Sequence, residues 1–134
     1  MAVLAVIDTH ALIWFCAGRL NRLGRDARRV LERVEEGNGA IFVPALALVE
    51  LAEAAHDGDV DPPGGFAVWV ERLFASGRFF PVDLTWAIVQ RAEELYAIPE
   101  RGDRLIAATA LELGYPLITR DHEIMAAAQV ETIW

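Results

Sequence analysis

The sequence contains a single cysteine, no lysine and no long hydrophobic run. Because Cys16 has no partner, an intrachain disulfide and a cysteine-rich zinc site are excluded, and we expect Cys16 to be buried on the helix after the first strand. No apolar stretch approaches the ~20 residues that a membrane-spanning helix requires. The opening residues MAVLAVIDTH turn acidic too early for a secretory signal, so we expect a cytoplasmic protein.

Positive charge is scarce and unevenly placed. The net charge of −8 disfavours nucleic-acid binding through an overall basic surface. All twelve basic residues are arginines, and six of them lie within residues 19–33: Arg19, Arg22, Arg25, Arg28, Arg29 and Arg33. Two interpretations remain open, because this cluster fits a solvated helix face and also an edge whose planar guanidiniums grip phosphate.

The spacing of apolar residues predicts alternating strands and helices in one domain, residues 1–134, whose 54% hydrophobic composition is enough for a core. Strands are expected at 3–7 (at the centre of the sheet), 40–43, 78–82, 116–119 and 131–134. Helices are expected after a Thr9 cap and over 24–36, 44–54, 66–74, 85–95 (behind an Asp83 or Thr85 cap), 101–113 and 121–129, with a loop at 56–65. This alternation predicts an α/β fold with a parallel sheet covered on both faces.

Acidic residues follow the predicted strands at the edge where open α/β sheets place their functional sites. Asp8 comes directly after the strand VLAVI, and Asp121 follows PLITR. Asp103 begins an alanine-rich helix, and Glu50 lies inside the helix PALALVELAEAA. Taken singly, the three aspartates also fit helix caps, and Glu50 also fits an exposed helix position.

Taken together, these carboxylates would repel one another at one end of a sheet, and a divalent cation would relieve that repulsion. Mg²⁺ and Mn²⁺ prefer oxygen ligands and usually take only one or two carboxylates directly. Such an ion acidifies a bound water and neutralises charge that builds on a phosphate. An acidic cluster in a chain without lysine therefore predicts hydrolysis of a phosphodiester.

Three segments resemble the PIN-domain ribonucleases, specifically the VapC-type toxins of bacterial toxin–antitoxin pairs: VIDTHALIW, ALALVELAE and GDRLIAATALELGYPLITRD. The resemblance covers essentially the whole chain and makes Asp8, Glu50, Asp103 and Asp121 the acids of the family's site. It implies a three-layer α/β/α sandwich with a mostly parallel sheet, Mg²⁺- or Mn²⁺-dependent endoribonuclease activity, a homodimer, and a cognate antitoxin that covers the acidic pocket. One position departs from it, because Glu100 stands where many relatives have an aspartate.

Thr9, Thr119 and Arg104 are secondary candidates beside these acids. The two hydroxyls are suited to orient a ligand water or a phosphate, although Thr9 also fits a helix cap and Thr119 a strand residue. Arg104 follows the third acid as in the family, and we favour a role in bracing Asp103 or a neighbouring acid over contact with phosphate. His10 and His122 adjoin site acids but lack metal-ligand spacing.

Other functional classes fit the sequence less well. An aspartyl phosphatase needs a second acid where His10 stands, and a receiver-type module needs a lysine. A non-catalytic PIN-like module that binds RNA or protein is the remaining alternative, although a retained anionic cluster is costly without catalysis. We therefore predict that a metal-activated water hydrolyses RNA phosphodiesters, and that an inhibiting partner brings arginine or lysine into the pocket.

Overall fold

The computed structural model describes residues 1–134 and contains a five-stranded, all-parallel sheet in the order β3-β2-β1-β4-β5. The strands are β1 (Val3–Ile7), β2 (Gly39–Pro44), β3 (Phe79–Val82), β4 (Leu117–Ile118) and β5 (Thr132–Ile133). The expected central position of the first strand is confirmed, because Val6 pairs with Phe42 of β2 on one side and Leu117 of β4 on the other. The carboxyl ends of all five strands therefore lie along one edge.

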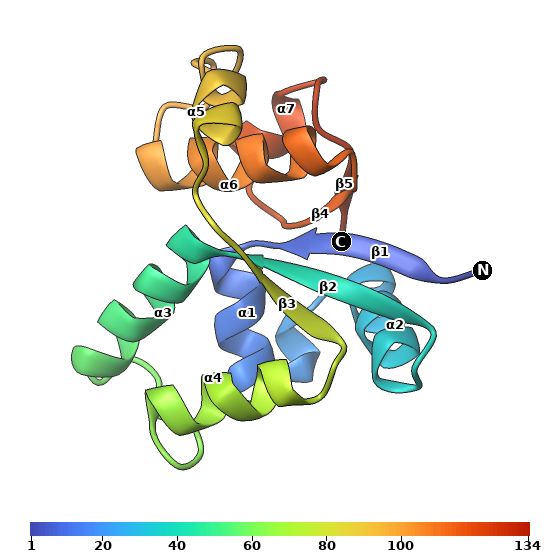
Figure 1. Ribbon diagram of the computed structural model, residues 1–134, viewed down its shortest axis with the longest axis vertical. Coiled ribbons are helices and arrows are strands. Elements are labelled where there is room, and N and C mark those ends of the chain that lie inside the picture. The colour runs from blue at the N-terminus through green and yellow to red at the C-terminus, as the bar shows by residue number, and fades with distance from the viewer.

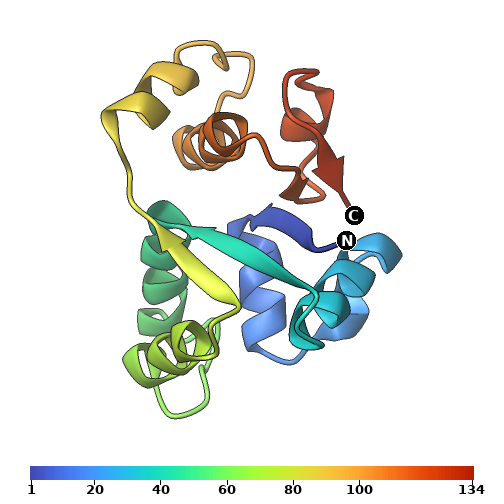
Figure 2. The same ribbon diagram turned by 45° about the vertical axis from the view of Figure 1, so that its right-hand side comes forward.

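Helices cover both faces of this sheet (Figures 1 and 2). One layer consists of α1 (Thr9–Cys16), α2 (Arg25–Glu35), α3 (Ala45–His56) and α4 (Phe66–Ala75), with a short 3₁₀ turn at Leu20–Arg22. The other consists of α5 (Trp86–Ala92), α6 (Arg101–Leu113) and α7 (His122–Ala126). The chain moves outward from β1 to β3 and then returns to β4, and right-handed crossovers place the helices of the two directions on opposite faces. The predicted three-layer α/β/α architecture is confirmed.

The core forms around β1, as its uninterrupted apolar sequence predicts. Ala5, Val6 and Ile7 are each 0% exposed, and Gly39 lies so close to β1 that an added Cβ would stand 2.2 Å from the carbonyl oxygen of Val3. Cys16 is buried as expected, and burial raises the pKa of its thiol to about 11, so this cysteine is a packing residue.

The sequence-based prediction is least accurate at the ends of the outer elements. The helix expected over 85–95 ends at Ala92, because Leu95 and Ile98 turn into the core, where the amide of Ile98 donates to the carbonyl of Leu95. Thr85 rather than Asp83 caps it, with Oγ1 accepting from the amide of Ile88 at 3.3 Å. The expected helix 121–129 spans only α7, and the expected strands 116–119 and 131–134 shrink to two residues each in β4 and β5.

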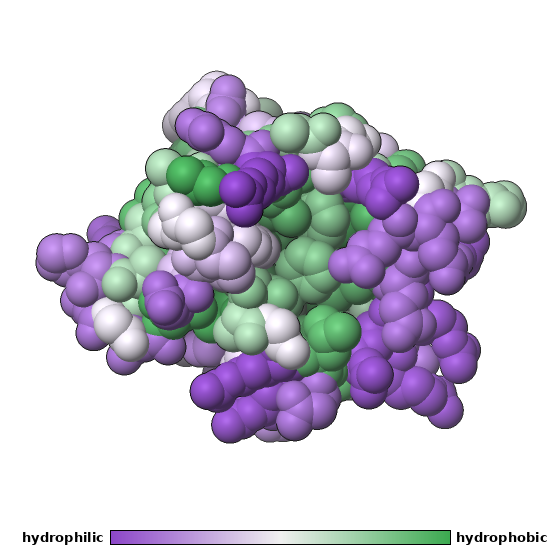
Figure 3. All heavy atoms as spheres, turned by 90° about the horizontal axis from the view of Figure 1, so that it is seen from below, coloured by the Kyte–Doolittle hydropathy of each residue, from purple (hydrophilic) through white to green (hydrophobic).

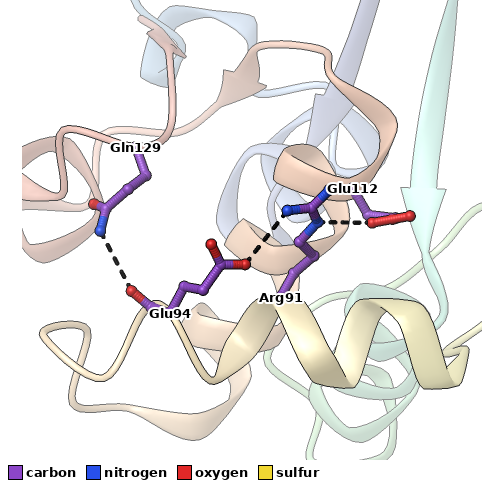
Figure 4. Close-up of polar contacts among 4 residues, drawn as sticks. All are labelled: Arg91, Glu94, Glu112 and Gln129. Carbon is purple, nitrogen blue, oxygen red and sulfur yellow. Dashed lines mark hydrogen bonds and ion pairs between the residues drawn. The ribbon is translucent and has the colours of Figure 1, made fainter.

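Polar contacts join residues within the layer of α5, α6 and α7 (Figure 4). The guanidinium of Arg91 in α5 donates to Glu112 in α6 at 2.9 Å and to Glu94 at 3.4 Å. The side-chain amide of Gln129, beyond α7, donates to the carbonyl of Glu94 at 3.3 Å. Each contact is exposed and individually weak, and the one between Arg91 and Glu112 joins α5 to α6, the helix that carries Asp103.

The layer of α1, α2, α3 and α4 has an apolar hollow bordered by hydrophilic side chains (Figure 3). The hollow, of about 690 Å³, includes Phe15 of α1 and Trp69 and Leu73 of α4. On the right of this view, hydrophilic side chains gather over α2. None of the helices combines the length and the apolar character needed to cross a membrane.

Candidate active site

A pocket of about 570 Å³ opens at the carboxyl ends of β1, β4 and β5. It is lined by Asp8, His10, Trp14, Asp103, Arg120, Asp121, His122, Met125 and Trp134. Three of the four predicted acids, Asp8, Asp103 and Asp121, thus meet in one pocket although they come from three separate stretches of the chain.

Asp8 is the most buried of these acids, with 7% of its surface exposed. It directly follows β1 and is the N-cap of α1, where Oδ1 accepts a hydrogen bond from the amide of Ala11 at 2.9 Å. The expected Thr9 cap is therefore wrong by one residue, because Asp8 already accepts from the first turn. Burial raises the pKa of Asp8, and the hydroxyl of Thr119 and the amide of Ala11 offset part of this rise.

Thr119 lies between two of the acids. It is 0% exposed, follows β4, and its hydroxyl faces Asp8 while accepting from the amide of Asp121 at 3.1 Å. Asp121 caps α7, with Oδ1 accepting from the amide of Ile124 at 2.9 Å. The cap interpretation is therefore confirmed for Asp8 and Asp121, and both residues also line the pocket.

Asp103 is not a cap. It lies in the first turn of α6, and Glu100 caps this helix by accepting from the amide of Asp103 at 2.6 Å. Burial and then the negative charges of Asp121, Glu100, Asp8 and Glu50 raise the pKa of Asp103 to about 7. Four neighbouring acids thus disfavour the charged form of Asp103, and the departure at Glu100 keeps both a cap and a negative charge.

Glu50 approaches the site from α3 without lining the pocket. Its Oε1 accepts a hydrogen bond from the hydroxyl of Thr9 at 2.5 Å. Its Oε2 lies beside the start of α6, where a Cβ added at Gly102 would stand 3.1 Å from it and 2.9 Å from Oε2 of Glu100. Glu50 is therefore half-buried and held at the rim, and the missing side chain of Gly102 makes room for it.

Arg104 does not brace an acid as we expected. Its guanidinium donates to the carbonyls of Ile98 and Pro99, at 3.0 and 3.4 Å, and lies 4.4 Å from the ring centre of Tyr96. The reason is that the turns after α5 place two carbonyls and an aromatic ring within reach of its guanidinium. Arg104 thus fixes the segment that leads into α6.

Sequence reasoning missed four residues of the pocket, Trp14, Arg120, Met125 and Trp134. The indole rings of Trp14 and Trp134 are 5.8 Å apart, and the guanidinium of Arg120 lies 4.8 Å from the ring centre of Trp14. His10 also packs on Trp14, at 5.8 Å. The only available signal was the position of Trp14 and Arg120 inside the segments VIDTHALIW and PLITRD.

The acids suit a hard divalent cation by their chemistry. No three His, Cys, Asp or Glu side chains are grouped closely enough to hold an ion among them. Mg²⁺ usually takes only one or two carboxylates and keeps several waters, so a complete cage is not required. Asp8, Asp103 and Asp121 supply carboxylate oxygens in one pocket, and their repulsion at Asp103 is what a cation would relieve. The donor set therefore fits Mg²⁺ or Mn²⁺.

Comparisons with known proteins identify the family and the fold. Over 133 residues the chain is 28% identical to Ribonuclease VapC22 of Mycobacterium tuberculosis, covering 96% of this chain and 97% of that protein. The fold resembles a chain in the structure of VapBC2 from Rickettsia felis bound to a promoter DNA fragment, with a TM-score of 0.72, 14% identity and coverage of 97% of both chains. It also resembles a chain of DNA-bound VapBC from Salmonella typhimurium, with a TM-score of 0.70, 16% identity and coverage of 98% of this chain and 97% of that one. The PIN domain family matches residues 5–130, so the chain belongs to the PIN domain family.

Proposed function

We propose that this protein is a metal-dependent endoribonuclease and the toxin of a type II toxin–antitoxin pair. The observation that carries the proposal is the convergence of Asp8, Asp103 and Asp121 in one pocket at the carboxyl edge of the sheet. The ribonuclease name of the relative from Mycobacterium tuberculosis supports RNA as the substrate.

Each acid has a distinct part in this proposal. Asp8 and Asp103 would hold the ion, helped by Asp121 and Glu50 directly or through water. A bound divalent ion would supply an acidified water and a counter-charge for the phosphate. Thr119 orients the carboxylate of Asp8 through its buried hydroxyl, and the caps of α1 and α7 fix the angles at which Asp8 and Asp121 enter the pocket.

The same pocket accounts for inhibition by an antitoxin. Two structural relatives are named as VapBC complexes, which supports an antitoxin partner for this chain as well. Three acids in one pocket favour a cation, so an antitoxin arginine or lysine placed among Asp8, Asp103 and Asp121 would replace the ion's charge. We further propose the homodimer that the resemblance to VapC-type toxins implies.

The direct test is cleavage of a mixed RNA pool by purified protein with Mg²⁺, with Mn²⁺ and with chelator. We expect cutting with either ion, none with chelator, and none by Asp103→Asn. The matched control is Asp57→Asn, which removes an exposed charge at the end of α3. Absence of cutting under every condition, with antitoxin shown to be absent, would contradict the proposal and favour a non-catalytic binding module.

A further inference from the structure

Trp134 connects the acidic pocket to the arginine-rich helix α2. Its side chain lines the pocket, and its carbonyl accepts a hydrogen bond from the amide of Asp26, in the first turn of α2, at 3.2 Å. Its indole also packs on Gly24, where an added Cβ would stand 2.6 Å from Cδ1 of the ring. The start of α2 therefore abuts the pocket wall, although α2 and the acids are far apart in the sequence.

Three arginines of α2 form an exposed basic surface, which we call the α2 arginine patch. Arg25, Arg28 and Arg29 line a shallow depression of about 310 Å³ together with Leu23 and Glu32. Arg25 is paired only with its neighbour Asp26, at 3.2 Å, and 81% of its side chain is exposed. Arg28 and Arg29 take part in none of the ion pairs of the structure. Their charges are thus free for an external anion.

The surface between this patch and the acids is aromatic. The rings of Trp14 and Trp134, which we call the indole wall, lie 5.8 Å apart at an interplanar angle of 59°. Arg120 adds a guanidinium at 4.8 Å from the ring centre of Trp14. Unpaired bases stack on aromatic side chains and on arginine planes, whereas the bases inside a duplex have no free face.

We propose that these three surfaces form one track for single-stranded RNA. The phosphate to be cut lies at Asp8 and Asp103, the adjacent unpaired base stacks on the indole wall, and the following phosphates lie on the α2 arginine patch. The inference rests on the proposed ribonuclease function and places the path of its substrate on this surface. It also explains how a chain with a net charge of −8 attracts RNA, because the cations are concentrated beside the pocket.

Binding to full-length Asp103→Asn protein with Mg²⁺ tests the track without cleavage. The probe is an unpaired dodecanucleotide, followed by fluorescence anisotropy over a range of salt. The test variant is Arg29→Gln, and the matched control is Arg72→Gln, which removes an exposed arginine of α4 that is also in no ion pair. We expect Arg29→Gln to reduce the salt slope of log K by about 0.7, the value for one phosphate contact on a single strand. Arg72→Gln should leave the slope unchanged.

The indole wall needs a second pair of variants. We expect Trp134→Leu to weaken binding of the unpaired RNA by roughly fivefold to a hundredfold, because the base stacked on Trp134 loses its aromatic partner. Trp134→Phe keeps an aromatic ring and should retain most of the wild-type affinity. Circular dichroism checks that each variant is folded. A duplex of the same sequence should bind weakly to every form and be insensitive to Trp134→Leu.

The outcomes separate this inference from the proposed function. Equal effects of Arg29→Gln and Arg72→Gln, or a duplex bound as tightly as the single strand, would overturn the track while wild-type cleavage still supports a nuclease. Conversely, RNA binding that depends on Arg29 and Trp134, with no cleavage by the wild type, would support the track and contradict the proposed ribonuclease activity.

Discussion

The hydroxyl of Thr9 donates a 2.5 Å hydrogen bond to Oε1 of Glu50, joining the first residue of α1 to the middle of α3. Thr9 is 9% exposed, and Glu50 is half-buried at the rim of the pocket. A hydrogen bond to a charged acceptor is worth about 1.5–3 kcal/mol, enough to fix the carboxylate in one orientation. This contact makes Thr9 a positioning residue for Glu50.

We therefore expect Thr9→Val to lower the kcat of RNA cleavage roughly tenfold, because an oriented carboxylate would be lost while substrate contacts remain. Thr9→Ser keeps the hydroxyl and should keep the rate. Steady-state kinetics on one RNA at saturating Mn²⁺ measures both variants. A Thr9→Val rate equal to that of the wild type would show that Glu50 needs no such support.

Gly102→Ala should separate activity from stability. The new Cβ would stand 2.9 Å from Oε2 of Glu100 and 3.1 Å from Oε2 of Glu50, so both carboxylates must shift. Alanine is favoured over glycine in a helix by about 1 kcal/mol, which offsets the crowding in the free energy of unfolding. We expect cleavage to fall between about tenfold and a hundredfold, because small misplacements of site groups are costly. Steady-state kinetics measures the cleavage rate, and urea unfolding measures the stability of the same variant. A loss of stability that accompanies the loss of cleavage would contradict this expectation.

Glu100→Gln separates the charge of Glu100 from its cap. The amide oxygen of glutamine can still accept from the amide of Asp103, but the negative charge that raises the pKa of Asp103 is gone. We expect the pKa of Asp103 to fall below about 7 in chelated protein, as followed by carboxyl-carbon NMR. Glu100→Ala removes the cap as well and should cost a further ~1 kcal/mol of stability. An unchanged pKa in Glu100→Gln would mean that the charge of Glu100 does not contribute to it, leaving burial and the other three acids.

The raised pKa of Asp103 also predicts how stability depends on pH. The ordinary pKa of 3.8 applies to the unfolded chain and about 7 to the folded one, so between these values the folded protein binds more protons. The contribution of Asp103 to the free energy of unfolding is fully present below its unfolded pKa of 3.8. This contribution is lost as the pH rises through the folded pKa of about 7. For a half-exposed side chain, solvent screening discounts the effect to the order of 1 kcal/mol.

Urea unfolding in chelator, at about pH 5 and about pH 8, measures this loss on either side of the raised pKa of Asp103. Asp103→Asn should lose less stability between the two pH values than the wild type, and Mn²⁺ should reduce the loss in the wild type. Identical pH profiles for wild type and Asp103→Asn would contradict the raised pKa.

Local sequence patterns predicted the centre of the fold and three acids that line one pocket. The apolar run before Asp8 indicated a buried strand, and the carboxyl edge of a parallel sheet then placed Asp8 and Asp121 together. Helix α6 has the bounds expected from its apolar spacing, and Gly114 ends it at a φ of 74°. Such features depend on residues a few positions apart, which a sequence displays directly.

The features that sequence analysis missed depend on contacts between distant segments. Trp134 reaches the pocket only because β5 pairs with β4 at the sheet's edge, and Trp14 meets it from α1. Arg104 follows Asp103 in sequence, but the turns before α6 supply its partners. The expected Thr9 cap was wrong because Asp8 already accepts from the first turn of α1. Neither strand order nor side-chain direction is visible in a local pattern.

The rate of RNA cleavage as a function of Mn²⁺ concentration tests the central claim most directly, with Asp8→Asn compared to the wild type and Asp57→Asn as the control. Asp8 is 7% exposed in the pocket, whereas Asp57 is exposed at the end of α3. We predict that the rate rises and saturates for the wild type and Asp57→Asn and stays at background for Asp8→Asn. An Asp8→Asn rate that saturates at the same value and the same Mn²⁺ concentration as the wild type would contradict a metal-dependent nuclease site in this pocket.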